Sequence, residues 1–278
     1  MFLIEILKTV LIGIIEGITE WLPVSSTGHM IIAEDFLKLH MSPEFWNMFL
    51  VVIQLGAILS VVVLYFSRLN PFSPKKSAAE KTSCFHLWGK ILVASVPAAV
   101  LGLLLDDFLE AHLMTPPVVA AALIVYGILF IVIEKIKKND TPRCGTVEEI
   151  TYGGALKIGL FQVLSLVPGT SRSGSTILGG MLTGVARPAG AEFSFFLAIP
   201  VMLGASALKI LKYVLDFGLA FTLQELTLLL VGIVVAFLVS LCAIRFLVSF
   251  VRRHSFAVFG WYRIALGVVV LGVNLLLS

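Results

Sequence analysis

The chain has 278 residues, of which 59% are hydrophobic and only 13% are charged. Soluble globular domains carry about 25% charged residues, so this composition excludes an ordinary soluble protein. The formal net charge of +3 gives no reason to expect a nucleic-acid partner. Three cysteines, Cys84, Cys144 and Cys242, are widely scattered and form no CxxC pair. This spacing argues against a disulfide framework or a thiolate metal site.

In chain order, the sequence alternates interrupted and continuous apolar segments. The first interrupted region covers about 1–38 and the second about 151–184. An apolar run near 20 residues matches a hydrocarbon core roughly 30 Å thick. We therefore expect one all-α, polytopic integral membrane domain over residues 1–278. Its six spanning helices are predicted at about 45–66, 90–105, 117–135, 191–213, 225–246 and 256–277.

Each interrupted region breaks at a proline that is followed by small hydroxyl residues. The first break is residues 23–28 (PVSSTG), and the second is residues 168–176 (PGTSRSGST). Proline ends a helix because it lacks the N–H group and clashes with the preceding turn. Irregular backbone at membrane depth is tolerated only where protein or a water-filled cavity surrounds it. The sequence therefore predicts two re-entrant helical hairpins, each entering and leaving on one side.

The two halves of the chain resemble each other. The pair Glu-Phe at 44–45 recurs at 192–193, and the proline breaks align at an offset near 145, which pairs Ser26 with Ser171. Each hairpin precedes three spans, and three is odd, so the second half starts on the opposite side. We predict two inverted-topology repeats, which would place a shared site near the midplane. Repeat one covers about 1–140, and repeat two about 150–278.

Charge is distributed unevenly over the predicted loops. The side of the N-terminus, called side X, receives Lys8, Lys38, Lys209 and Lys212, while Arg172 lies inside the second hairpin. The opposite side, side Y, receives the rest of the 20 Lys and Arg: Arg68, Lys75, Lys76, Lys81, Lys90, Lys135, Lys137, Lys138, Arg143, Lys157, Arg187, Arg245, Arg252, Arg253 and Arg263. Cytoplasmic loops carry the excess of Lys and Arg. We therefore expect side Y in the cytoplasm and both termini outside.

Two glutamates stand out in the first hairpin. A charge inside hydrocarbon costs roughly 2.5–3.5 kcal/mol on insertion scales, so such residues are functional candidates. Glu16 and Glu20 are four residues apart and share one helical face. They need a cation between them, a shared proton, or a partner such as Arg172. Carboxylates suit a hard divalent cation, Mg²⁺ or Ca²⁺. The alternative is a protonated glutamate that is hydrogen-bonded within a helix interface.

Hydroxyl groups and an imidazole follow the first proline within one turn. Histidine suits proton transfer near neutral pH and can activate a hydroxyl nucleophile, so Ser26 and His29 are candidate catalytic groups. His29 is also a candidate nucleophile towards phosphorus. Ser25 and Thr27 are candidate substrate-binding hydroxyls. In the alternative interpretation, these side chains only cap the helix that starts near His29.

The second break has the composition of an anion-binding loop. A helix start near Ser175 would direct backbone N–H groups towards a negative ligand. Arg172 adds a planar fork that matches phosphate. Alternatively, Arg172 pairs with Glu20 or Glu16 and only holds the two halves together.

These residues carry a family resemblance. Residues 16–29 (EGITEWLPVSSTGH) and 168–176 resemble the two signatures of the bacterial undecaprenyl-diphosphate phosphatases, the bacitracin-resistance family. The similarity covers the whole chain, and Trp21 stands where the family pattern has phenylalanine. The resemblance implies hydrolysis of undecaprenyl diphosphate to undecaprenyl phosphate and inorganic phosphate in the bacterial plasma membrane. That reaction recycles the lipid carrier for cell-wall synthesis and gives bacitracin resistance on overproduction.

The resemblance also implies roles for individual residues. Glu16 and Glu20 become an acidic pair linked to dependence on a divalent cation, and Arg172 becomes the diphosphate clamp. Ser26 and His29 become the nucleophile and acid/base candidates. The hydroxyls of Ser171, Ser173 and Thr176 become further phosphate contacts. The site is expected towards the outer leaflet.

One other interpretation stays open at this point. Inverted repeats with broken helices are also how secondary transporters bind substrates, so the protein is alternatively a lipid-phosphate transporter or flippase without hydrolysis. The expected partners are a polyprenyl diphosphate lipid, membrane lipids and a second copy of the chain as a homodimer.

Overall fold

Helices make up most of the structure. The computed structural model describes residues 2–37, 39–137, 139–218 and 221–277. Within these ranges the chain forms α-helices and one 3-10 helix joined by turns, and the one extended pairing is an isolated bridge between Cys144 and Val185. Six helical segments are long and apolar enough to cross a membrane: Pro43–Leu64, Ala78–Leu105, Pro116–Ile136, Arg187–Phe217, Leu223–Val251 and Ala257–Leu276. They confirm the six predicted spans and make the chain a multi-pass membrane protein.

The first two spans differ from the predicted ones in detail. The segment expected at 45–66 is two consecutive helices, α3 (Pro43–Val52) and α4 (Gln54–Leu64), which break at Ile53 and lead into the short α5 (Phe66–Leu69). Helix α6 (Ala78–Leu113) is far longer than the expected 90–105. A capping box starts it, in which the side chains of Ser77 and Glu80 bind each other's backbone N–H. The first turns of α6 are polar, so a prediction based on apolar runs does not include them.

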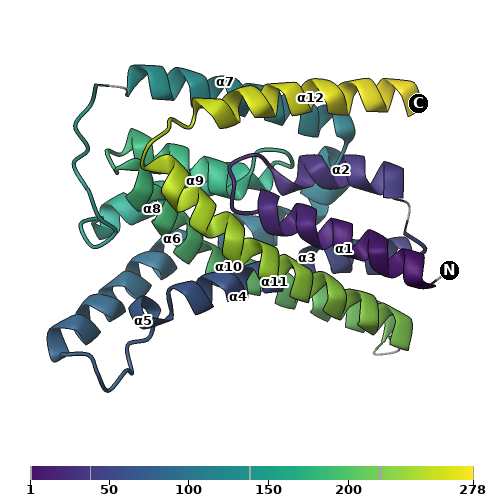
Figure 1. Ribbon diagram of the computed structural model, residues 1–278, viewed down its shortest axis with the longest axis horizontal. Helices are drawn as coiled ribbons and strands as arrows, with labels where there is room; N and C mark the ends of the chain where they lie inside the picture. The colour runs from purple at the N-terminus through teal and green to yellow at the C-terminus, as the bar shows by residue number, and fades with distance from the viewer. Residues whose placement is uncertain (1, 38, 138, 219–220, 278) are drawn as a thin grey trace.

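The remaining long helices are α7 (Pro116–Ile136), α10 (Arg187–Phe217), α11 (Leu223–Val251) and α12 (Ala257–Leu277). Small residues let several of them pack closely. In the pair α7–α12, a Cβ on Gly127 would lie 2.7 Å from the carbonyl oxygen of Gly260, and one on Gly260 would lie 2.6 Å from that of Gly127. Either side chain would force the two helices apart. Figure 1 shows α7 and α12 side by side along one edge of the molecule.

Both interrupted regions form helical hairpins. The first consists of α1 (Phe2–Thr19) and α2 (Ser26–Leu37). The second consists of α8 (Tyr152–Val163), the 3-10 turn η1 (Leu164–Leu166) and α9 (Arg172–Leu182). The backbone N–H of His40 donates to Glu5 Oε2 at 3.1 Å, and that of Arg143 donates to the carbonyl of Gly184 at 2.8 Å. Each hairpin therefore begins and ends at the same end of the molecule.

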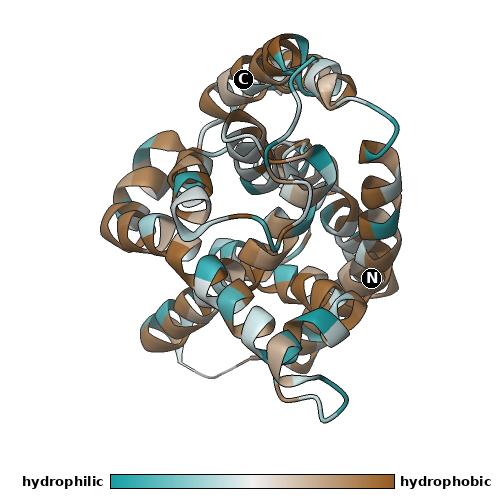
Figure 2. Cartoon of the chain, turned by 90° about the vertical axis from the view of Figure 1, so that its left-hand side faces the viewer, coloured by the Kyte–Doolittle hydropathy of each residue, from teal (hydrophilic) through white to brown (hydrophobic). Residues whose placement is uncertain are grey.

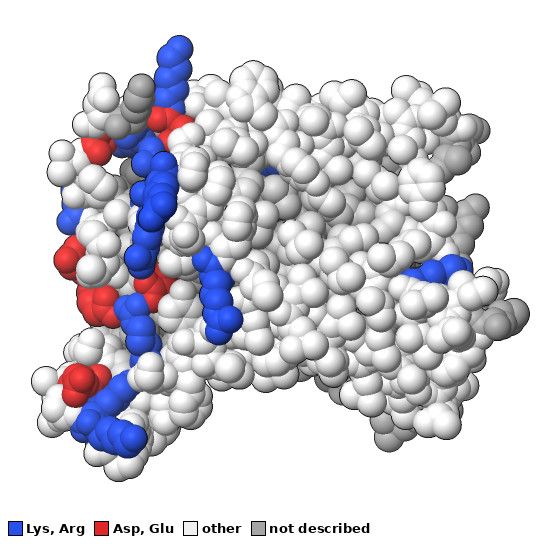
Figure 3. Space-filling view, in the orientation of Figure 1, with Lys and Arg blue, Asp and Glu red and all other residues white. Residues whose placement is uncertain are grey.

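The surface suits a lipid environment. Large apolar side chains of the long helices are exposed, among them Leu104 and Leu230, and Figure 2 shows apolar residues along the outer helices. Figure 3 shows Lys and Arg gathered at the end of the molecule where α6 begins and α7 connects to α8, with far fewer at the opposite end. This is the uneven distribution that the loop assignment predicted. Lys38 and Lys138 lie outside the described residues.

Arg263 corrects one part of that assignment. We counted it among the cations of side Y, but it is fully buried, with 0% of its surface exposed. It lies in the second turn of α12 and points into the protein, where backbone carbonyls bind it. Only the tertiary structure shows the direction of the side chain.

Candidate functional site

The turns of the two hairpins share one local geometry. Ser25 and Ser171 are the non-glycine residues with positive φ in the described chain, at 74° and 71°. Each stands just before a helix. The Oγ of Ser25 accepts from Gly28 N at 3.4 Å, and the Oγ of Ser171 accepts from Gly174 N at 3.2 Å. Both serines are therefore helix caps, in a backbone conformation that is uncommon outside glycine. By its backbone φ and its capping bond, Ser171 thus matches Ser25, which lies one residue before the Ser26 of the predicted alignment.

The helices that follow the turns begin three residues earlier than expected. We placed the starts near His29 and Ser175, whereas α2 begins at Ser26 and α9 at Arg172. Because the caps are Ser25 and Ser171, Ser26 and Arg172 occupy the same first position of their helices. Two matching backbone turns thus present two different functional side chains, a hydroxyl and a guanidinium.

Glu20 joins these two side chains. The Ser26 hydroxyl donates to Glu20 Oε2 at 3.1 Å. Arg172 donates to Glu20 Oε1 from Nη2 at 3.1 Å and from Nε at 3.3 Å. The ion pair is largely removed from solvent, with 10% and 8% of the two side chains exposed. The predicted ion pair between Arg172 and Glu20 is therefore present. The hydroxyl of Ser26, the candidate nucleophile, is hydrogen-bonded to the same carboxylate.

Other groups hold Arg172 in place. Its Nη1 donates to the carbonyl of Ser194 in α10 at 2.8 Å. Its guanidinium carbon lies 5.7 Å from the ring centre of Trp21, within the range of a cation–π contact. Trp21 is fully buried and makes an edge-to-face contact with Phe195 at 5.3 Å. The fork of Arg172 therefore has a fixed orientation.

Two further hydroxyls of the second signature, those of Ser173 and Thr176, are bonded within the protein. Ser173 Oγ lies 3.2 Å from the carbonyl oxygen of Glu20 and 3.3 Å from that of Leu22, so it connects the second turn to the first. Thr176 Oγ1 lies 2.7 Å from Ser194 Oγ. Both side chains are buried, as is Ser25, whereas Ser26, Thr27, His29 and Ser171 are half-buried. For Ser173 or Thr176 to contact phosphate, these internal hydrogen bonds would have to break and be replaced by hydrogen bonds to the phosphate oxygens.

His29 is directed away from Ser26. Its Nδ1 lies 2.7 Å from the carbonyl oxygen of Ser25. A carbonyl only accepts, so Nδ1 carries the proton. Its Nε2 lies 2.7 Å from the hydroxyl of Tyr262 in α12. The structure thus pairs the Ser26 hydroxyl with Glu20 and pairs His29 with Tyr262.

Arg263 is a site residue that the sequence analysis missed. Its Nη1 donates to the carbonyl of Pro23 at 3.3 Å, and its Nη2 donates to those of Gly169 and Thr170 at 2.8 and 2.9 Å. One side chain therefore binds the backbone of both turns. An arginine inside a predicted span was the signal that could have identified it.

The acidic pair fits a divalent cation only in part. Glu16 is buried, and its Oε1 has no hydrogen-bond partner among the described residues. Within the same residues, no cluster of three or more His, Cys, Asp and Glu could hold a metal ion. Mg²⁺ is commonly bound by one or two carboxylates together with substrate phosphates. Glu16 and Glu20 match that mode, with the substrate supplying the other oxygens.

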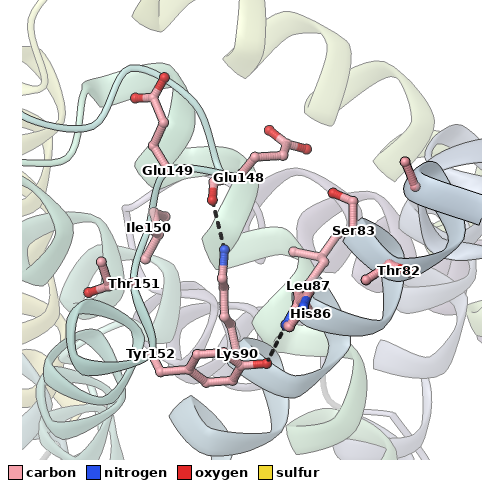
Figure 4. Close-up of a pocket in the computed structure, with 11 residues that line it drawn as sticks. Thr82, Ser83, His86, Leu87, Lys90, Glu148, Glu149, Ile150, Thr151 and Tyr152 are labelled. Carbon is pink, nitrogen blue, oxygen red and sulfur yellow. Dashed lines mark hydrogen bonds between the residues drawn. The ribbon is translucent and has the colours of Figure 1, made fainter.

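A separate cavity of about 690 Å³ lies away from the two turns (Figure 4). It is lined by the first turns of α6 and the segment leading into α8. Lys90 there donates to the carbonyl of Glu148 at 2.8 Å, and His86 Nδ1 lies 3.2 Å from the Tyr152 hydroxyl. It contains a second tyrosine–histidine pair but none of the predicted site residues.

Comparison with known proteins identifies the family. The family described as bacitracin resistance protein BacA matches residues 9–269. This chain belongs to that family. Proteins named undecaprenyl-diphosphatase are similar over nearly the whole length. One from Enterococcus faecalis (strain ATCC 700802 / V583) is 54% identical over 272 residues, which are 98% of each chain. One from Desulfitobacterium hafniense is 55% identical over 98% of this chain and 96% of its own. The match to the BacA family includes both turns and α12 up to residue 269.

Proposed function

We infer that this protein hydrolyses undecaprenyl diphosphate to undecaprenyl phosphate and inorganic phosphate, and so recycles the carrier lipid. The observation that carries this function is the Glu20 carboxylate, which accepts from the Ser26 hydroxyl and binds the Arg172 guanidinium across the two hairpins. A nucleophile, its base and a phosphate-binding group are thus adjacent. Relatives named undecaprenyl-diphosphatase support hydrolysis rather than transport without cleavage.

Ser26 is the proposed nucleophile. Its Oγ attacks the terminal phosphorus as Glu20 accepts the hydroxyl proton. A bond from Oγ to phosphorus forms, the bond from phosphorus to the bridging oxygen breaks, and undecaprenyl phosphate leaves. Water then attacks the phosphorus and gives a proton to Nε2 of His29, the proposed acid/base group of this step. The bond from phosphorus to Oγ breaks, Oγ regains its proton from Glu20, and inorganic phosphate leaves. Arg172 binds the phosphate oxygens and neutralises the charge that develops on them.

The rival mechanism uses His29 as the nucleophile and Ser26 as a phosphate donor. In the structure Nε2 of His29 is bonded to the Tyr262 hydroxyl, so that nitrogen has to leave its partner before it attacks. Ser26 is already bonded to its base. We therefore favour Ser26, with Ser25, Thr27, Ser171, Ser173 and Thr176 as proposed substrate contacts.

Glu16 and Glu20 are the proposed ligands of a divalent cation, Mg²⁺ or Ca²⁺, that the two carboxylates share with the substrate. When bound, such an ion neutralises part of the diphosphate charge. The carboxylate oxygen of Glu16 that has no partner supports this proposal.

We further propose that the chain consists of two inverted repeats. Three observations support this proposal. Ser25 and Ser171 both have positive φ, and Arg263 binds the carbonyls of Pro23 and Gly169. Three long apolar helices also follow each hairpin. An offset of 146 relates both pairs of residues. In this arrangement the hairpins are re-entrant from opposite faces.

The proposed orientation in the bacterial plasma membrane follows from charge. The end of the molecule that is rich in Lys and Arg faces the cytoplasm, both termini lie outside, and the site opens towards the outer leaflet. A homodimer stays a prediction.

Phosphate release by detergent-purified protein tests the function. We expect undecaprenyl diphosphate to be cleaved with Mg²⁺ or Ca²⁺ and not with chelator. Glu20→Gln removes the base for Ser26 and the charge that binds Arg172, so kcat should fall about 100- to 10,000-fold.

Glu5→Gln is the matched control, since Glu5 is another buried carboxylate of the first hairpin, bound to Lys8 and His40 near the start of α1. It should stay close to wild type. Wild-type protein that is folded and releases no phosphate with either cation would refute the function, and lipid-phosphate transport would then be the next hypothesis to measure.

A further inference from the structure

Helix α12 belongs to the site although neither signature includes it. Arg263 is bound to both turns, which fixes the position of α12 against the ends of the two hairpins. The preceding residue, Tyr262, reaches a different part of the site. It is 47% exposed, and its ring lies nearly parallel to the ring of His29, with centres 5.7 Å apart and an interplanar angle of 11°. Its hydroxyl is 2.7 Å from His29 Nε2.

The hydrogen bonds of His29 define its protonation pattern. Nδ1 donates to the Ser25 carbonyl, so in the neutral ring Nε2 carries the lone pair. The Tyr262 hydroxyl then donates to Nε2. Both nitrogens are thus occupied, one by the turn that precedes α2 and one by α12. A histidine held from both sides has one tautomer and one ring orientation.

We propose that Tyr262 is a positioning residue of the phosphatase site, which holds His29 in its Nδ1-protonated form and keeps Nε2 occupied until substrate binds. The proposal rests on the proposed function. It explains why the hydroxyl of Ser26 is bonded to Glu20: the lone pair of His29 is directed to α12. It also assigns a role to an exposed polar side chain among the apolar residues of α12.

Tyr262→Phe tests the role because it removes only the hydroxyl from a half-exposed side chain. We expect kcat to fall about 10-fold, the usual size of losing a group that orients a functional histidine, with KM changed less than about twofold. The matched control is Tyr152→Phe. Tyr152 also bonds a histidine, His86, but in the cavity of Figure 4. That variant should keep wild-type kcat.

A second measurement does not need activity. Diethyl pyrocarbonate acylates unprotonated imidazole, and mass spectrometry gives the rate at His29. The rate should increase several-fold in Tyr262→Phe, since Nε2 loses its partner, and should be unchanged in Tyr152→Phe.

The outcomes distinguish a failure of the proposed role of Tyr262 from a failure of the proposed phosphatase function. An unchanged kcat in Tyr262→Phe overturns the positioning role, whatever the rate of acylation. A raised KM with unchanged kcat also overturns it, because Tyr262 would then bind substrate directly. If wild-type protein releases no phosphate, the proposed function fails, and an equal acylation rate in wild type and Tyr262→Phe would independently refute the contact.

Discussion

At the scale of single residues, the site depends on how one carboxylate is shared. Glu20 lies just after the end of α1, so its side chain reaches both the start of α2 and the start of α9. Removing one member of a desolvated ion pair leaves the other charge uncompensated and costs about 3–5 kcal/mol. Arg172 and Glu20 therefore stabilise the fold in addition to their proposed roles in the reaction, and their variants need a folding control.

The phosphorylated intermediate decides between the two nucleophiles. We expect rapid acid quenching during turnover to trap phosphoserine at Ser26, mapped by mass spectrometry of peptides. Ser26→Ala should abolish the trapped species and lower kcat at least about 1,000-fold, as loss of a nucleophile does. Phosphohistidine at His29 in wild-type protein would contradict this mechanism.

Physical rules predicted part of the site from the sequence. Glu16, Glu20 and Arg172 were identified because charge is costly in hydrocarbon, and Ser26 because hydroxyls and an imidazole follow a helix break. The same rules gave no partner for His29, since Tyr262 lies 233 residues further along the chain. The direction of the Arg263 side chain was also unpredictable, because it depends on how α12 packs.

At the scale of helices, close approach of backbones sets the packing. A Cβ on Gly56 of α4 would collide with the backbone carbonyl of Ile233 in α11. The proposed repeat aligns Gly56 with Gly204 of α10, 148 residues later, yet nothing lies within 4 Å of a Cβ on Gly204. The two glycines thus have different packing constraints.

The two glycines provide a matched pair of variants. Gly56→Ala should destabilise the protein by about 1–3 kcal/mol, the range for overpacking, while Gly204→Ala should be neutral or slightly stabilising because alanine is the better helix former. Thermal unfolding in detergent measures both. Equal melting temperatures for the two variants would contradict the packing of α4 on α11.

Helix existence was more predictable than helix ends. The prolines at 23 and 168 marked both breaks correctly. Proline alone does not end a helix in this protein, because Pro97 lies inside α6 and Pro200 inside α10. The first residues of α2 and α9 were misplaced, since the caps are serines in a left-handed conformation that no composition rule specifies. The start of α6 was also misplaced, because the capping box at Ser77 lies outside the apolar run from which the span was predicted.

At the scale of the whole molecule, the orientation in the membrane is measurable. In a chain with Cys84, Cys144 and Cys242 replaced by serine, we expect Gln224→Cys to react with a membrane-impermeant maleimide on intact cells. Lys75→Cys should react only after permeabilisation. Gln224 precedes the apolar core of α11, and Lys75 lies in the turn before α6; both are exposed.

Reversed labelling would place the Lys- and Arg-rich end outside and invert the proposed orientation. Labelling of both cysteines on intact cells would contradict the number of spans between them.

The pairing of distant turns has a consequence for biosynthesis. Glu20 and Arg172 are 152 residues apart in the chain, so the ribosome delivers the carboxylates of the first hairpin to the translocon long before Arg172, the partner of Glu20, exists. An unpaired carboxylate at membrane depth costs roughly 2.5–3.5 kcal/mol. The nascent first half therefore has to keep Glu16 and Glu20 protonated or in water. Arg263, which binds the backbone of both turns, arrives later still, so we expect a chain that ends before α12 to be inactive.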